Sequence, residues 1–280
     1  MTALASNLRK QLDNAVQKAR DTGETAASAA LQRLGVPEPR RPDYLDAEQA
    51  RLRNRLRAHA RQLGDTLYAD DRQDTERLVT EIAYQQWHRM LFARFLAENG
   101  LLIHPDFNAP VTLADCAELA EDEGVRDAWT LAGRFAARML PQIFRPDEPA
   151  LALAFAPEHQ RALEQLLEAL PAETFTASDA LGWVDQFWQS KKKDEVNRSG
   201  VKIGADELPA VTQLFTEHYM VLFLLHNTLG AWWTGKHPNE APPVELEYLR
   251  RLDDGTPAAG TFDGWPATAR DLRVMDPCCG

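Results

Sequence analysis

The chain has 280 residues, of which 44% are hydrophobic and 26% are charged, and its formal net charge at pH 7 is −11. This length is enough for one large domain or two ordinary ones with a buried core. The acidic balance argues against a protein that binds nucleic acid mainly through a basic face of its own. The sequence therefore predicts a globular protein whose contacts with nucleic acid, where they exist, are local.

The cysteines, the histidines and the amino terminus argue against a disulfide-linked protein, a metal site and a membrane protein. The three cysteines, Cys116, Cys278 and Cys279, form no C-x-x-C pair and do not suggest a disulfide framework. His88 and His104 have no second ligand at a useful spacing, so we expect no metal site. Charged residues interrupt the amino terminus, and no apolar run approaches the roughly 20 residues that span a bilayer. The sequence predicts a cytoplasmic protein with no membrane partner.

Residues 1–42 are predicted to form N-terminal helices followed by a proline-rich linker. Apolar residues at three- and four-residue steps predict a helix over residues 3–20, and an alanine-rich stretch continues this pattern over residues 25–34. Three prolines between residues 37 and 42 then predict a stiff, non-helical connector. The front piece is interpreted as a dimerisation arm or a docking helix.

Residues 43–175 are predicted to form a helical domain. Residues 74–99 form its strongest single helix, which is apolar around much of its circumference and is therefore expected at the centre of the core. One earlier helix carries five arginines, for which two interpretations stay open: contact with phosphates, or a solvated face paired with nearby carboxylates. The predicted helices cover residues 46–63, 74–99, 112–119, 125–144 and 157–170.

Residues 176–280 show a different pattern. An aromatic-rich helix near residues 179–188 is followed by a polar loop with three lysines, a turn, and a strongly apolar helix that ends at Trp233. Thr216 stands where the apolar helix needs an N-cap. Residues 272–276 are predicted to form a short strand. A strand followed in the sequence by a glycine turn is typical of nucleotide pockets in open α/β sheets.

Four motifs of this last segment carry a resemblance to a known family. They are LGW…QFW…KKKDEV, LPAVTQLFT, the apolar helix that ends in NTLG..W, and VMDPCCG. Together they resemble the amino-terminal part of adenine-specific DNA methyltransferases, of the type IIG restriction–modification and BREX (PglX) or DISARM phage-defence kinds. The resemblance is close over about residues 178–280 and loose before them.

The resemblance implies a cofactor site for S-adenosylmethionine. Asp276, Pro277 and Gly280 match the family's aspartate–proline–glycine turn, which lies against the methionine part of the cofactor. A carboxylate there can accept charge-assisted hydrogen bonds from the cofactor's ammonium group, and a glycine allows close approach of the backbone. Thr216 matches the threonine near the cofactor's carboxylate, although Glu217 stands where the family usually has proline.

The resemblance also implies a fold and an activity. The expected fold is mainly α: an N-terminal helical domain that leads into the first strand of a truncated Rossmann-like methyltransferase domain. The expected reaction is methyl transfer to the exocyclic amine of adenine in double-stranded DNA, with other defence-system subunits as further partners. The family's base-gripping motif is not among these residues, so no catalytic residue is assigned and the isolated chain is expected to be inactive.

Alternatives remain open for the lysines and for the whole chain. Lys191, Lys192 and Lys193 are interpreted either as contacts to the DNA backbone or as a solvated loop balanced by Asp194 and Glu195. The chain as a whole is alternatively a non-enzymatic helical interaction module that positions a partner protein. A nicotinamide-binding fold is disfavoured, because a single terminal glycine is not a G-x-G-x-x-G fingerprint.

Overall fold

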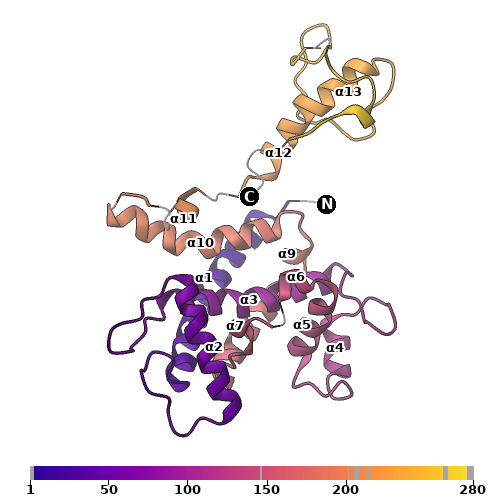
Figure 1. Cartoon of the computed structure of the whole chain (residues 1–280). Coiled ribbons are helices and arrows are strands. Elements are labelled where there is room, and N and C mark those ends of the chain that lie inside the picture. Colours follow the sequence, from indigo (N-terminus) through magenta and orange to yellow (C-terminus); the bar gives the residue numbers. More distant parts are fainter. Residues whose placement is uncertain are drawn as a thin grey trace. The chain divides into compact units, whose positions relative to one another are not determined.

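The computed structural model of the chain describes residues 3–145, 147–200, 202–204, 208–212, 215–260 and 264–275 (Figure 1). The chain divides into two compact units, Met1–Leu214 and Phe215–Gly280. The described part is mainly α, as predicted, and within it the only β pairing is three isolated bridges. The sequence placed its divisions after residues 42 and 175 instead.

Eleven helices of the first unit fall within the described residues. They are α1 (Ser6–Arg33), α2 (Ala47–Leu63), α3 (Glu76–Glu98), α4 (Leu113–Leu119), α5 (Ala128–Met139), α6 (Pro141–Phe144), α7 (Pro149–Ala152), α8 (Pro157–Glu168), α9 (Glu173–Thr176), α10 (Ala180–Ser199) and α11 (Leu208–Thr212). The second unit contains α12 (His218–Leu225), a π-helical turn (His226–Gly230), α13 (Ala231–Lys236) and a short 3-10 turn (Ala269–Asp271).

Helix α3 is the centre of the first unit, as its apolar pattern predicts. It packs against α1, α2, α5, α7, α8 and α9. Trp87 and Leu91 of α3 are fully buried, and the end of the helix shares a core with Leu131 and Phe135 of α5. A helix that is apolar around most of its surface is stable only when other helices surround it.

Helix α1 joins the same core instead of forming a separate arm. It runs unbroken through both stretches that the sequence predicted separately, and it packs against α3, α8 and α10. Gly23 marks the close approach to α3, because a Cβ atom at this position would lie 3.1 Å from Cβ of Ala83. The proline-rich connector that follows therefore joins two helices of one unit.

Several helix ends confirm the sequence predictions. Asp46 and Thr112 each form a capping box at the start of α2 and α4, and Pro157 opens α8. The helix predicted over residues 125–144 is divided, because Pro141 starts a new short helix, α6, after the non-helical Leu140. The predicted starts at residues 46, 112 and 157 are thus confirmed, because each depends on neighbours in the sequence.

Two arginines of α2, Arg53 and Arg57, bind main-chain carbonyl groups of the first unit. Arg53 is buried and donates to the carbonyl oxygen of Gly35 (Nε–O 2.9 Å) and to that of Glu38. Arg57 donates to the carbonyls of Val36 and Asp71 at 2.6 and 2.7 Å. Burial lowers the pKa of both guanidinium groups. These two arginines hold the proline-rich connector in place, so for them neither of the two interpretations of the sequence is right.

A row of stacked rings lies along one side of α3. His88 stacks between Tyr84 and Phe92, with ring centroids 5.3 and 5.7 Å away. Burial lowers the pKa of His88, and the charge of Asp185 opposes this shift. The ring is therefore held neutral by its apolar surroundings, as expected for a histidine inside a row of aromatic side chains.

We predict that His88 makes the protein less stable as the pH falls. Because its folded-state pKa is below the ordinary value, its contribution is complete above about pH 6.5 and is lost as the pH falls through the folded pKa. Urea unfolding at pH 7.5 and 5.5 measures this loss. The variant His88→Phe keeps the stack without the titration and should lose less stability over that range. An equal loss in both proteins would assign the pH dependence to other groups.

Candidate functional site

The helix of the second unit is strongly apolar, as predicted, and it is exposed at its start. The described surroundings bury no residue of α12, and six large apolar side chains are exposed there: Tyr219, Met220, Val221, Phe223, Leu224 and Leu225. The π-helical turn follows directly, and α13 continues the helix to Lys236 (Figure 1). Single π-helical turns often occur at functional sites.

Two polar residues in the π-helical turn fix the segment that crosses it. His226 is buried, and its Nδ1 accepts a hydrogen bond from the backbone N–H of Tyr248 at 3.1 Å. Asn227 donates to the carbonyl of Tyr248 at 2.8 Å and accepts from the N–H of Arg250 at 3.0 Å. The side-chain amide of Asn227 thus donates to and accepts from the main chain of residues 248–250, as the backbone of a neighbouring β-strand would.

Apolar packing and one tryptophan complete this unit. A Cβ atom at Gly230 would lie 2.9 Å from the side chain of Leu246, so the small residue allows close packing. Trp232 donates from Nε1 to the carbonyl of Pro266 at 2.8 Å. Two residues of the motif NTLG..W therefore have a structural role: Asn227 binds the main chain of residues 248–250, and Gly230 allows close packing of Leu246. The sequence interpretation missed this role, although two polar residues in the middle of an apolar helix were a usable signal.

Thr216 lies just before α12 and does not cap it. The N-cap residue is Glu217, and its side chain makes no capping hydrogen bond. The predicted capping role is wrong by one position, because the helix begins at His218 instead of Glu217. Thr216 is exposed, so its hydroxyl group can meet a ligand at the helix start.

The predicted strand and glycine turn lie at the edge of what the structure describes. Leu272 has extended backbone angles, but residues 272–275 pair with no strand in the described part of the chain. A strand requires hydrogen bonds to a neighbour, and the described residues offer none there. Asp276, Pro277 and Gly280, with both adjacent cysteines, lie outside the described residues. The strand thus stays a prediction.

The three lysines lie in a helix, so the predicted polar loop is wrong. Helix α10 continues through Lys191, Lys192 and Lys193 to Ser199. Nζ of Lys191 lies 2.8 Å from Oδ1 of Asp21 and 3.1 Å from Oε2 of Glu24, both on α1. Its hydrogen bond to Asp21 raises the pKa of Lys191. The partner carboxylates are thus distant in the sequence, unlike the adjacent ones that the solvated interpretation assumed.

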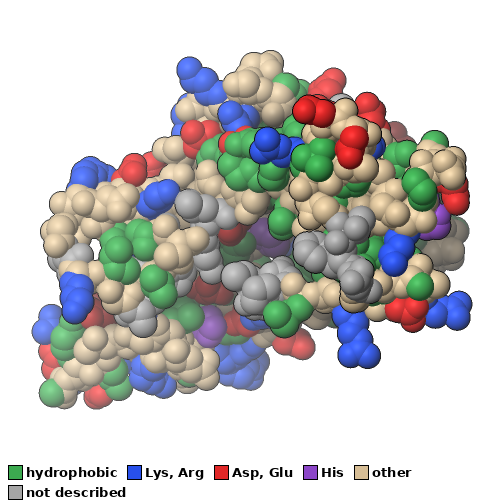
Figure 2. Space-filling view, turned by 90° about the horizontal axis from the view of Figure 1, so that it is seen from above, with side chains coloured by type: hydrophobic (Ala, Val, Ile, Leu, Met, Phe, Trp, Pro, Cys, Tyr) green, Lys and Arg blue, Asp and Glu red, His purple; other side chains and the backbone are tan. Residues whose placement is uncertain are grey.

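Charges of both signs are mixed on the face of the protein that Figure 2 shows. In the view of Figure 2, Lys and Arg side chains are spread among acidic and apolar ones. This pattern agrees with the overall acidity of the chain.

One group of side chains in the first unit has the residue types of a metal site. Ligand atoms of His104, Asp106 and Glu123 lie within 4.8 Å of one another. However, Nδ1 of His104 accepts hydrogen bonds from the N–H groups of Asp106 and Phe107, at 3.2 and 3.4 Å. A neutral ring that accepts at Nδ1 carries its proton on Nε2, which leaves no lone pair for a metal. The geometry indicates a histidine that caps a turn.

Comparison with known proteins gives two relatives. The chain is 33% identical over 122 residues to the adenine-specific methyltransferase BrxX of Escherichia coli O9:H4 (strain HS), which covers 42% of this chain and 10% of the relative. It is 23% identical over 195 residues to the adenine-specific methyltransferase PglX of Lacticaseibacillus casei (strain Zhang), which covers 56% and 16%. The chain resembles adenine-specific methyltransferases. The resemblance stated from its motifs is confirmed.

The match covers only a small part of each relative. The chain spans about a tenth of the length of one relative and about a sixth of the other. No family model and no solved structure matches. Among the described residues, no helix has the length and apolar character that crossing a membrane requires.

Proposed function

We propose that this chain is the N-terminal part of an adenine-specific DNA methyltransferase that works in restriction–modification or phage defence. The longer protein would transfer a methyl group from S-adenosylmethionine to the exocyclic amine of adenine in double-stranded DNA, in the cytoplasm. The observation that carries the proposal is the similarity to two relatives that are both named adenine-specific methyltransferases. Because the chain spans only part of these relatives, the isolated chain is proposed to be inactive.

We propose that Thr216, Asp276, Pro277 and Gly280 serve the cofactor. One structural feature supports the role of Thr216: this exposed residue stands next to the N-cap residue of α12, Glu217, whose side chain makes no capping hydrogen bond. N–H groups at such a helix start, with a hydroxyl group beside them, suit a carboxylate. The carboxylate of Asp276 would hold the cofactor's ammonium group, and Gly280 would let the backbone come close.

The test is methyl transfer by the full-length protein. We expect Asp276→Ala to reduce incorporation of labelled methyl groups into duplex DNA by about 100-fold, because a hydrogen bond to a charged group is worth about 1.5–3 kcal/mol. Glu217→Ala is the matched control: it removes a carboxylate beside Thr216 and should retain activity. Activity of Asp276→Ala equal to that of the wild type would contradict the cofactor assignment. Methyl transfer by the 280-residue chain alone would contradict the proposed inactivity of the fragment.

The lysines of α10 give a separate prediction about DNA. In the full-length protein, replacing Lys191, Lys192 and Lys193 by alanine should weaken DNA binding and reduce its salt dependence, as loss of phosphate contacts does. Replacing Lys191 alone should change the salt dependence less, because its charge already faces Asp21 and Glu24. Binding measured from low to high salt gives the slope. An unchanged slope in the triple variant would remove the DNA role.

A further inference from the structure

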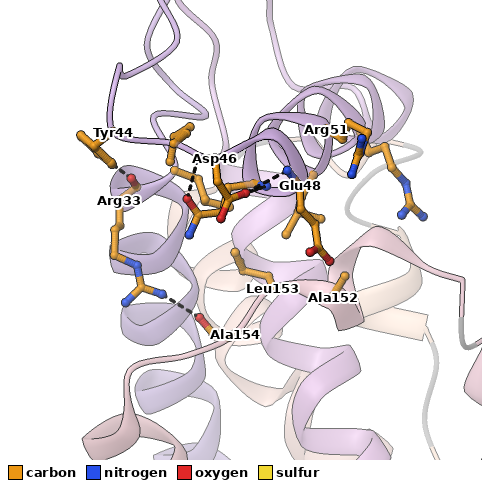
Figure 3. A pocket seen from close by; sticks show the side chains of 13 residues that line it. Arg33, Tyr44, Asp46, Glu48, Arg51, Ala152, Leu153 and Ala154 are labelled. Atoms are coloured by element: carbon orange, nitrogen blue, oxygen red, sulfur yellow. Dashed lines mark hydrogen bonds between the residues drawn. The ribbon is translucent and has the colours of Figure 1, made fainter.

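A pocket of about 730 Å³ opens between the end of α1, the start of α2 and residues 152–154, all within the first unit (Figure 3). Its floor is apolar, because the buried residues Leu34, Leu45 and Leu153 line it. Exposed arginines stand at its rim: Arg33, Arg51 and Arg55. The pocket is within the range of about 300–1,000 Å³ that is usual for binding sites.

The segment that forms most of this pocket is basic, although the whole chain is acidic. Residues 33–61 contain eight arginines, no lysine and four acidic residues, which gives a local net charge of +4 in a chain of −11. Arginine is enriched at protein interfaces and lysine is depleted there, because the planar guanidinium group binds carboxylates with two hydrogen bonds. The composition of this segment is therefore typical of an interface.

The hydrogen bonds of Arg33 and Arg55 do not neutralise their charges. Arg33 donates to the carbonyl of Ala154 at 3.1 Å, and Arg55 donates to the carbonyl of Asp147. Carbonyl groups are neutral, so both guanidinium charges remain effective. Arg51 is exposed and makes no hydrogen bond or ion pair within the described residues.

The pocket also has two carboxylates. Asp46 is held in place, because it accepts hydrogen bonds from the N–H groups of Glu48 and Gln49, both at 2.8 Å, but these neutral donors leave its charge effective. Glu48 also lines the pocket, and its side chain points towards Ala152 (Figure 3). Asp46 and Glu48 both oppose an anion in the pocket, and against the three arginines they leave the lining with a net charge of +1 (+3 − 2).

We propose that this pocket binds a short acidic peptide segment of a partner protein, with one bulky apolar side chain on the floor and carboxylates against the arginines. A buried apolar floor within a polar, arginine-bearing rim is the usual arrangement of a protein interface. A DNA backbone fits the rim but not the floor, since it has no apolar side chain to bury. The inference concerns the first unit and is independent of the cofactor residues.

The test uses the whole 280-residue chain and a fluorescein-labelled heptapeptide with a central leucine and three glutamates on each side. Fluorescence anisotropy should show binding that weakens at least about fivefold in Arg51→Ala and in Arg33→Ala, as expected for loss of an interface ion pair. Glu48→Gln should tighten binding, because it removes one of the two opposing charges. Arg138→Ala is the control, since Arg138 is exposed and is not among the residues that line the pocket.

Two altered peptides separate charge from apolar contact. A peptide with lysines in place of the glutamates, and one with glycine in place of the leucine, should each bind more weakly than the original. Absence of binding by the original peptide, or equal binding by either altered peptide, overturns the proposal. Loss of peptide binding on addition of a short DNA duplex, itself sensitive to Arg51→Ala, also overturns it and makes the surface a DNA site.

Discussion

Replacing Arg94 by alanine is expected to lower the free energy of unfolding of the first unit by about 3–5 kcal/mol, because it leaves buried carbonyl groups without a donor. Arg94 lies on α3 and only 8% of its surface is exposed. Its guanidinium group donates to the carbonyls of Leu167 and Leu170, the second at 2.8 Å. These carbonyls belong to the end of α8 and the residues that follow it.

The same side chain makes two further contacts. It packs 4.4 Å from the ring centroid of Phe175, and its Nε donates to Glu98 at 3.2 Å. The variant Arg94→Ala therefore loses a helix cap, a cation–π contact and packing volume together. Because α3 and α8 are both part of the core, the loss should be seen in global unfolding.

Two variants serve as comparisons. Arg94→Lys keeps the charge but cannot reach both carbonyls with a planar fork, so it should lose part of the same free energy. Arg138→Ala changes an exposed arginine at the end of α5 and should cost less than about 0.5 kcal/mol. Urea unfolding followed by circular dichroism measures all three. A loss below about 1 kcal/mol in Arg94→Ala would show that the buried fork contributes little beyond its surroundings.

Much of the helical fold was predictable because its signals are local. The caps at Asp46 and Thr112 and the proline that opens α8 act on residues within one helical turn. The apolar circumference of α3 likewise predicts a central helix from one stretch of sequence. Features of this kind need no knowledge of the tertiary structure.

The errors have a common physical cause, which is contact between distant residues. The run of three lysines and two acidic residues predicts a loop at Lys191. In the structure this stretch is helical, and Lys191 forms ion pairs with Asp21 and Glu24 of α1. Arg53 reads as a surface residue, yet it is buried beneath the proline-rich connector whose carbonyls it binds. No spacing rule within the sequence states which carbonyl an arginine will reach.

The candidate site was recognised from motifs and not from geometry. The motif residues that carry the resemblance include Asn227, which binds the main chain of Tyr248, and Gly230, which allows close packing of Leu246. The roles of Asp276 and Gly280 rest on the family's pattern alone, because these residues lie outside the described ranges. A short strand and turn have no independent stability, so their sequence predicts structure only together with the sheet that they join.

The second large effect is expected at Asp65, which caps α3 from a distance. Thr75 is the N-cap residue of α3 by position, but its side chain makes no capping hydrogen bond. Instead, the buried carboxylate of Asp65 accepts from the N–H of Arg77 and from that of Leu78, both at 2.9 Å. A carboxylate with two such bonds at a helix start is favoured by the helix dipole as well.

Asp65→Ala should therefore lower the free energy of unfolding by about 2–3 kcal/mol, since two N–H groups lose a charged acceptor. Thr75→Ala, one residue before the same helix, should cost less than about 0.5 kcal/mol, because no side-chain cap is removed. Asp65→Asn tests the charge, since the amide keeps one acceptor oxygen and should lose an intermediate amount. Urea unfolding at pH 7 ranks the three variants. A larger loss in Thr75→Ala than in Asp65→Ala would mean that position in the sequence, and not the distant carboxylate, decides how α3 begins.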